Sequence, residues 1–183
     1  MRIVGGSLRG RKLSCLEAQG LRPTADKVRQ AIFNILEHRY FPAGLGGLRV
    51  LDICAGTGAL ALEALSRGAA SAVCVEADAD ACRLIAHNAA HAEIELQVRV
   101  VQQPAAAFCA GADLAAFDLI VADPPYQQQE TLDAIVAVCR TTARGVFVVE
   151  TAAGVAIEGA DTRRYGRTAV SFLDFRPLPS AHQ

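Results

Sequence analysis

The sequence predicts an α/β domain with a doubly wound, mostly parallel sheet of seven strands. From residue 48 onward, short apolar runs alternate with helical segments, which is typical of a parallel sheet covered on both faces. Glycines follow the first of these runs, where a strand turns into a helix. The last two runs flank Gly166 and Arg167, so they predict an antiparallel hairpin at the end of the sheet.

We expect residues 1–183 to form a single domain, with residues 1–40 as an N-terminal extension. The sequence of this extension predicts a strand pair followed by a helix. Thr24 is expected to cap the helix, and Asp26 lies in its first turn. The expected strands of the main body are residues 48–53, 71–76, 94–101, 117–122 and 145–150. The expected helices are residues 59–67, 78–91 and 130–140, and the hairpin strands are residues 162–165 and 168–175.

Composition excludes several classes of protein. The chain is 52% hydrophobic and 20% charged, so it can bury a core and is neither disordered nor low in complexity. It carries no apolar run long enough to span a bilayer and no signal-peptide pattern at Met1. Its six cysteines form no Cys-x-x-Cys pair, which favours reduced thiols in a cytoplasmic protein.

Charge is unevenly distributed along the chain. Residues 1–40 hold eight Lys or Arg against three acidic residues, whereas the whole chain has a net charge of −1. A basic extension on an acidic body suggests an anionic partner, although a solvated surface segment would show the same charge.

The first functional motif follows the strand at residues 48–53. Gly56 and Gly58 let the backbone approach a ligand, and Glu76 stands at a strand end, where a carboxylate can accept hydrogen bonds from ribose hydroxyls. A dinucleotide such as NAD would also suit this spacing, but Asp52 favours a cationic ligand end such as the amino group of S-adenosylmethionine. The candidate cofactor residues here are Asp52, Ala55, Gly56, Thr57, Gly58, Glu76 and Ala77.

The second motif, Asp123-Pro124-Pro125-Tyr126, follows the strand at residues 117–122 and so lies at the carboxyl edge of the sheet. Two prolines stiffen the backbone and leave carbonyl oxygens as acceptors. The Asp123 carboxylate and the Pro124 carbonyl can accept both hydrogens of an exocyclic amine, while Tyr126 stacks on the base. This arrangement predicts methyl transfer to a nucleobase amine, with Asp123, Pro124, Pro125 and Tyr126 as the catalytic residues.

The two motifs together resemble the amino-methyltransferases that modify adenine N6, cytosine N4 or guanine N2. A narrower resemblance extends over nearly the whole chain: it is similar to the bacterial 16S rRNA guanine-N2 methyltransferases of the RsmD family. The matching segments are residues 1–6, 9–13, 21–29, 33–36, 55–60, 62–69 and 123–126. The resemblance implies a Rossmann-like methyltransferase fold, S-adenosylmethionine as the methyl donor, and guanine-966 of 16S rRNA as the target.

One position departs from the family pattern. Members tend to place Asp or Asn at the end of the third strand to contact the adenine amino group, but this chain has Gln103 followed by Pro104. Proline cannot supply that contact, so we expect Gln103 or the backbone to make it.

We expect the extension to contact the rRNA, free or in the small subunit, because the acidic body repels phosphates. The predicted RNA-binding residues are Arg2, Arg9, Arg11, Lys12, Arg22, Lys27 and Arg29.

His87 and His91 lie one helical turn apart but lack a third ligand, so no metal site is predicted. We also expect no membrane association and a monomer.

Overall fold

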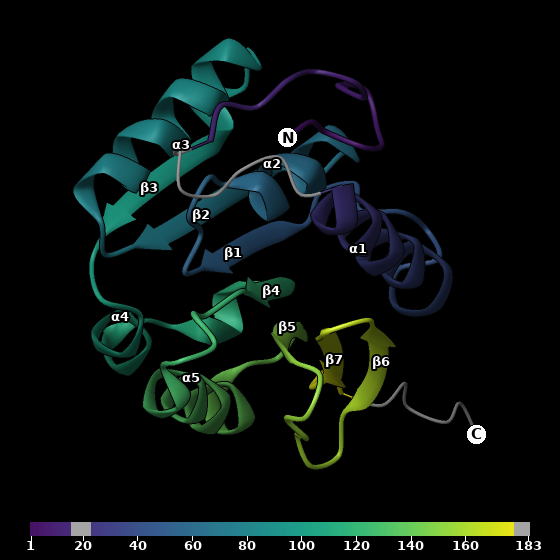
Figure 1. Cartoon of the computed structure of the whole chain (residues 1–183), viewed down its shortest axis with the longest axis vertical. Helices are drawn as coiled ribbons and strands as arrows, with labels where there is room; N and C mark the ends of the chain where they lie inside the picture. The colour runs from purple at the N-terminus through teal and green to yellow at the C-terminus, as the bar shows by residue number, and fades with distance from the viewer. Residues whose placement is uncertain (16–22, 178–183) are drawn as a thin grey trace.

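The computed structural model describes residues 1–15 and 23–177 (Figure 1). In this part of the chain, seven strands form one sheet in the order β3-β2-β1-β4-β5-β7-β6. The first five strands in this order pair in parallel, and β7 runs antiparallel to both β5 and β6, which confirms the predicted hairpin. The strands are β1 Arg49–Ile53, β2 Ser71–Glu76, β3 Val98–Gln102, β4 Leu119–Ala122, β5 Val146–Ala152, β6 Asp161–Tyr165 and β7 Thr168–Asp174.

Helices cover both faces of the sheet, as the alternating pattern predicted. α1, α2 and α3 lie on one face, and α4 and α5 lie on the other (Figure 1). Side chains alternate between the two layers along β5: Val146 and Val148 join the core on the α1 side, while Phe147 and Val149 join the core on the α5 side. The α-helices are α1 Pro23–Ile35, α2 Ala59–Ser66, α3 Ala79–His91, α4 Ala105–Gly111 and α5 Gln129–Thr142, and a π-helix, Leu36–Tyr40, follows α1 directly.

Four details differ from the sequence prediction. The expected N-terminal strand pair is a single antiparallel bridge between Arg2 and Lys12. α1 begins at Pro23, which places Thr24 inside the helix and not at its cap, although Asp26 lies in the first turn as expected. β3 begins at Val98 because residues 95–97 form a 3₁₀ turn. α4 was not predicted, since its alanine-rich segment has no apolar stripe and buries only Ala105 and Cys109.

The N-terminal segment lies along the outer side of α2 and α3. The Met1 sulfur lies 3.7 Å from the Thr57 hydroxyl, close to the start of α2, whereas the Ser7 N–H donates to the Ser66 carbonyl at the end of that helix. Arg11 returns along α3 and donates to the carbonyl of His91 at 2.8 Å. α2 and α3 each lead back to the start of a parallel strand, so the turn at residues 6–10 lies near the amino edge of the sheet.

A buried ion-pair network holds this segment on the domain. Glu63 is fully buried, and its carboxylate accepts hydrogen bonds from the Val4 N–H and from the Arg67 side chain. Arg29, also buried, pairs with Asp26 at 2.8 Å and lies 3.5 Å from Glu63. No helix within the described ranges is long and apolar enough to cross a membrane.

Candidate cofactor and catalytic site

The glycine loop turns sharply between β1 and α2. Gly56 and Gly58 both have positive φ angles, of 55° and 75°, and the Gly58 N–H donates to the Ala55 carbonyl at 2.7 Å. A Cβ on Gly58 would lie 3.1 Å from the Ile85 side chain, so α3 packs directly against the loop. The loop therefore needs glycine at position 58 for its conformation and also for the packing of α3.

Glu76 connects this loop to the end of β2. One carboxylate oxygen accepts the Gly56 N–H at 2.9 Å, and the other accepts the N–H groups of Ala77 and Asp78 at 2.8 and 3.0 Å. These three hydrogen bonds hold the carboxylate in a fixed position. Because the residue is only half-buried, the carboxylate stays accessible from the edge of the sheet. A fixed carboxylate can accept hydrogen bonds from two neighbouring hydroxyl groups of a ribose.

Asp52 has a structural role that the sequence did not predict. Its side chain is only 1% exposed, and one oxygen accepts the Ala61 N–H in the first turn of α2 at 3.0 Å. Among the described residues, its other oxygen has no hydrogen-bond partner. Burial raises the pKa of Asp52 to about 7, and the negative charges of Asp123 and Glu76 act in the same direction. Within the part of the chain that the structure describes, neither a cation nor a second hydrogen bond offsets the burial of this carboxyl group.

The Asp-Pro-Pro-Tyr motif follows β4 directly. The Asp123 N–H donates to the carbonyl of Ile53 at 3.3 Å, which places the motif beside the strand that carries the glycine loop. Pro124 is buried and Asp123 is exposed. The backbone is therefore fixed while the carboxylate faces outward.

Tyr126 extends from the motif toward the end of the sheet that carries β7. Its hydroxyl lies 3.0 Å from the Thr168 hydroxyl and 3.4 Å from a carboxylate oxygen of Glu150, and 48% of the residue is exposed. Burial of part of the side chain raises the pKa of Tyr126, so the phenol is protonated at neutral pH. A shallow hollow beside the motif is lined by Pro124, Tyr126, Leu132, Glu150 and Thr151.

The structure brings the predicted cofactor and catalytic residues to one edge of the sheet. They lie at or just after the carboxyl ends of β1, β2, β3 and β4, which are neighbouring strands of the sheet. Gln103 belongs to this group, because its N–H donates to the Glu76 carbonyl at 2.9 Å and its side chain is half-buried. Pro104 precedes α4 as the residue at its cap.

The predicted RNA-binding residues lie in several different environments. The prediction that Arg29 contacts RNA is wrong, because the residue is buried. Its guanidinium group is enclosed by Asp26, Glu63 and the Arg2 carbonyl. Arg11 pairs with Glu93 at 3.2 Å near the end of α3. The exposed members are Arg2, Arg9, Lys12 and Lys27, and Arg22 lies outside the described residues.

Two supporting contacts of the site could not be found from the sequence pattern. Asn88 is fully buried in α3, donates to the Thr57 carbonyl at 3.0 Å and forms two hydrogen bonds with the backbone of Ser14. It therefore fastens the N-terminal segment to the glycine loop. Thr168 meets Tyr126 only because β7 returns antiparallel to β5, which is a tertiary feature with no local signal.

The architecture and the two motifs at its carboxyl edge define the class of the protein: it has the fold of the S-adenosylmethionine-dependent methyltransferases. Hypothetical protein TTHA0928 of Thermus thermophilus superimposes with a TM-score of 0.80 at 31% identity, over 95% of this chain and 99% of that one. An RNA methyltransferase from Salinibacter ruber, solved with S-adenosyl-L-homocysteine, shares the fold at 14% identity with a TM-score of 0.61, over 88% of this chain and 97% of that one.

The particular family follows from the sequence comparisons. The model of the family described as Conserved hypothetical protein 95 matches residues 1–173. The ribosomal RNA small subunit methyltransferase D of Escherichia coli K12 is 38% identical over 136 residues, which span 73% of this chain and 65% of that protein. Its Haemophilus influenzae counterpart is 33% identical over 76% of this chain and 70% of that protein. The chain belongs to this family, the RsmD family.

Proposed function

We propose that the chain is an S-adenosylmethionine-dependent methyltransferase that methylates the exocyclic N2 amine of a guanine in 16S rRNA. One observation carries the proposal: the glycine loop and the Asp-Pro-Pro-Tyr motif lie side by side at one sheet edge, joined by the Asp123 to Ile53 hydrogen bond. A nucleoside bound against Glu76 and an amine bound against Asp123 would then be neighbours. The curated relatives named as rRNA methyltransferases support RNA as the substrate class.

The residues on the cofactor side fit S-adenosylmethionine. Glu76 would accept hydrogen bonds from the ribose hydroxyls, and the unpartnered oxygen of Asp52 would bind the amino group of the methionine moiety. The half-buried Gln103 would contact the adenine. When bound, the cofactor supplies an electrophilic methyl group on a sulfonium.

Asp123 and Pro124 would bind the amine that receives the methyl group. The lone pair of a base amine is delocalised into the ring, which makes the nitrogen a poor nucleophile. Acceptance of both amine hydrogens by the Asp123 carboxylate and the Pro124 carbonyl would pyramidalise the nitrogen and direct its lone pair outward. Once the base has flipped out of the RNA stack, the exposed ring of Tyr126 would stack on it, a contact worth ~1–3 kcal/mol.

A binding and transfer assay tests this function. Titration with S-adenosylmethionine should stabilise the protein against heat, whereas NAD should not. Transfer of a labelled methyl group to 16S rRNA should require the acceptor at position 123, so Asp123→Ala should bind the cofactor but lose turnover. Near-normal turnover in Asp123→Ala, or stabilisation by NAD alone, would contradict the mechanism.

The identity of the base rests on resemblance, because Asp-Pro-Pro-Tyr also suits adenine N6 and cytosine N4. We propose guanine-966 as the target nucleotide, and nucleoside analysis of the methylated RNA distinguishes the three amines. A cytoplasmic location, a monomeric state and the absence of a metal remain predictions.

A further inference from the structure

The hairpin of β6 and β7 carries three arginines that are not among the predicted RNA-binding residues. Arg163, Arg164 and Arg167 lie within five residues, and no acidic residue occurs between positions 162 and 173. Arg163 forms an ion pair with Asp161 at 3.0 Å. Arg164 and Arg167 are exposed, and within the described ranges neither forms an ion pair. Two cations are therefore available to a partner on this hairpin.

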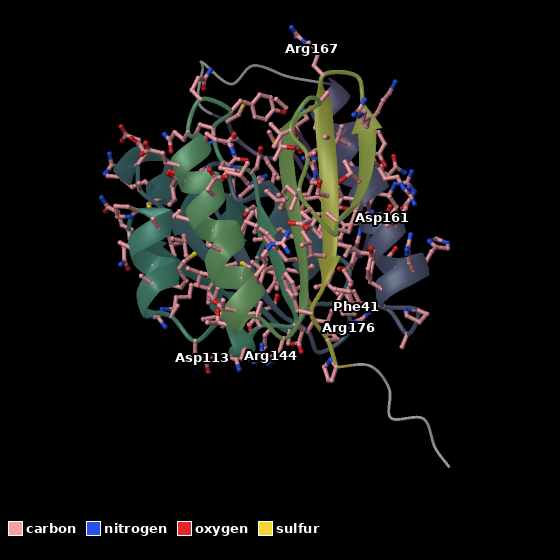
Figure 2. The ribbon with its side chains drawn as sticks, turned by 90° about the horizontal axis from the view of Figure 1, so that it is seen from below. Phe41, Asp113, Arg144, Asp161, Arg167 and Arg176 are labelled. Atoms are coloured by element: carbon pink, nitrogen blue, oxygen red, sulfur yellow. The ribbon has the colours of Figure 1, made fainter. Side chains whose placement is uncertain are left out.

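The hairpin turn lies at the catalytic edge of the sheet. β7 runs antiparallel to β5, so Thr168 pairs with Ala152 at the carboxyl end of β5. The Thr168 hydroxyl lies 3.0 Å from the Tyr126 hydroxyl, which places Arg167 one residue away from a direct contact of the catalytic motif. Figure 2 shows Arg167 projecting from one end of the molecule, with Arg144 and Arg176 at the other end.

The hairpin holds these cations in fixed positions. Tyr165 pairs with Thr168 across a two-residue turn, and Gly166 supplies the positive φ of 64° that this turn requires. Farther down the hairpin, the hydroxyls of Thr162 and Ser171 lie 2.8 Å apart. Arg164 therefore extends from paired backbone, and Arg167 extends from the short turn, where its carbonyl accepts the Ala153 N–H at 3.0 Å.

An RNA substrate needs positive charge at this edge. Phosphates that flank a base bound at Asp123 would approach an edge that already carries the carboxylates of Glu76 and Glu150. The N-terminal turn cannot neutralise them locally, because Arg9 and Arg11 lie near the amino edge, as the hydrogen bonds to Ser66 and His91 show. Arg164 and Arg167 lie at the same edge as Asp123, where they can neutralise these phosphates.

We propose that the β6–β7 hairpin binds the RNA backbone next to the target nucleotide, with Arg164 and Arg167 contacting phosphates. This inference rests on the proposed function, since it assumes that the partner is RNA. In this arrangement, the hairpin fixes the position of the RNA strand, and Tyr126 and Asp123 bind the base that leaves the strand.

Paired substitutions with a matched control test the inference. The double variant R164A/R167A removes both cations, and R99A/R144A removes two exposed arginines from the start of β3 and the segment before β5. The probe is 16S rRNA from a strain that lacks the gene. Its dissociation constant is measured by fluorescence anisotropy over a series of salt concentrations, together with cofactor affinity by calorimetry. Thermal midpoints of all variants confirm that the proteins are folded.

We expect R164A/R167A to weaken RNA binding about tenfold at physiological salt and to reduce the salt slope by ~1.4, at ~0.7 per phosphate contact. R99A/R144A should stay close to the parent, R164K/R167K should restore most of the affinity, and cofactor affinity should not change. If R164A/R167A matches the control in affinity and slope while the parent methylates rRNA, this inference alone fails, and the arginines serve to keep the edge strand from pairing. A parent that transfers no methyl group to rRNA overturns the proposed function and this inference with it.

Discussion

Replacing Asp52 by asparagine should make the protein more stable above neutral pH and weaken its binding of S-adenosylmethionine. The side chain is 1% exposed, and one of its oxygens has no partner among the described residues. Burial raises its pKa from 3.8 to about 7, so the folded protein binds this proton more tightly than the unfolded chain does. The free energy of unfolding should therefore fall as the pH rises from about 4 to about 7.

The size of this effect follows from the two pKa values. A difference of about three pKa units corresponds to ~4 kcal/mol of stability lost between pH 4 and pH 8, at 1.36 kcal/mol per unit. An asparagine oxygen can still accept the Ala61 N–H, but its amide nitrogen would be a buried donor without a partner, which costs ~1–3 kcal/mol. We therefore expect Asp52→Asn to be ~1–3 kcal/mol more stable than the parent at pH 8.

Urea unfolding at pH 5, 6.5 and 8 measures the change in stability. Asp80→Asn, at an exposed position on α3, removes the same formal charge but retains Asp52, so it should keep the pH dependence of the parent. Calorimetric titration in buffers of different ionisation enthalpy measures proton exchange on cofactor binding. A cationic amino group beside Asp52 would lower the pKa of its carboxyl group, so the parent should release a proton at pH 6.5 and the variant should not.

Two results would refute this reasoning. If the free energy of unfolding depends on pH equally in the parent and in Asp52→Asn, then burial does not raise the pKa of the Asp52 carboxyl group. Unchanged cofactor affinity, with the expected change in stability, would reduce Asp52 to a residue that only caps α2.

Three further predictions concern the loop and its supports. Glu76→Ala should weaken S-adenosylmethionine binding tenfold or more by calorimetry, because each charge-assisted hydrogen bond to ribose is worth ~1.5–3 kcal/mol, and unchanged affinity would remove Glu76 from the site. Asn88→Ala should lower the free energy of unfolding by ~1–3 kcal/mol in urea titrations, because it removes the hydrogen bonds to the buried Thr57 carbonyl and to the partly buried backbone of Ser14. An unchanged midpoint would contradict this. Burial raises the pKa of Cys54 to about 12, so alkylation at pH 7.5 should be slow and Cys54→Ala should keep methyl transfer; loss of turnover would give the thiol a chemical role.

The sequence predicted the sheet and its carboxyl edge because both depend on local patterns. Apolar strand runs alternate with helices, and the motifs at Gly56 and Asp123 follow strands directly. The order of neighbouring strands then brings Asp52, Glu76 and Asp123 together, as expected for residues at the ends of parallel strands.

Other features depend on contacts between distant residues, which no local pattern reveals. Arg29 looked like a surface cation, but its burial depends on Glu63, a residue of α2. Arg11 belongs to a basic run, yet its position near the amino edge follows from its contact with the end of α3. The closeness of Thr168 to Tyr126 follows from the antiparallel return of β7.

Nucleoside mass spectrometry of 16S rRNA tests the central claim most directly. RNA from a strain without the gene is incubated with S-adenosylmethionine and either the parent protein or Asp123→Ala. One part of the RNA is digested to nucleosides, and another part is cut into fragments to locate the methyl group. We expect the parent to add one N2-methylguanosine per rRNA, at guanine-966, and Asp123→Ala to add none. Methylation of an adenine or a cytosine, or equal methylation by both proteins, would contradict the account.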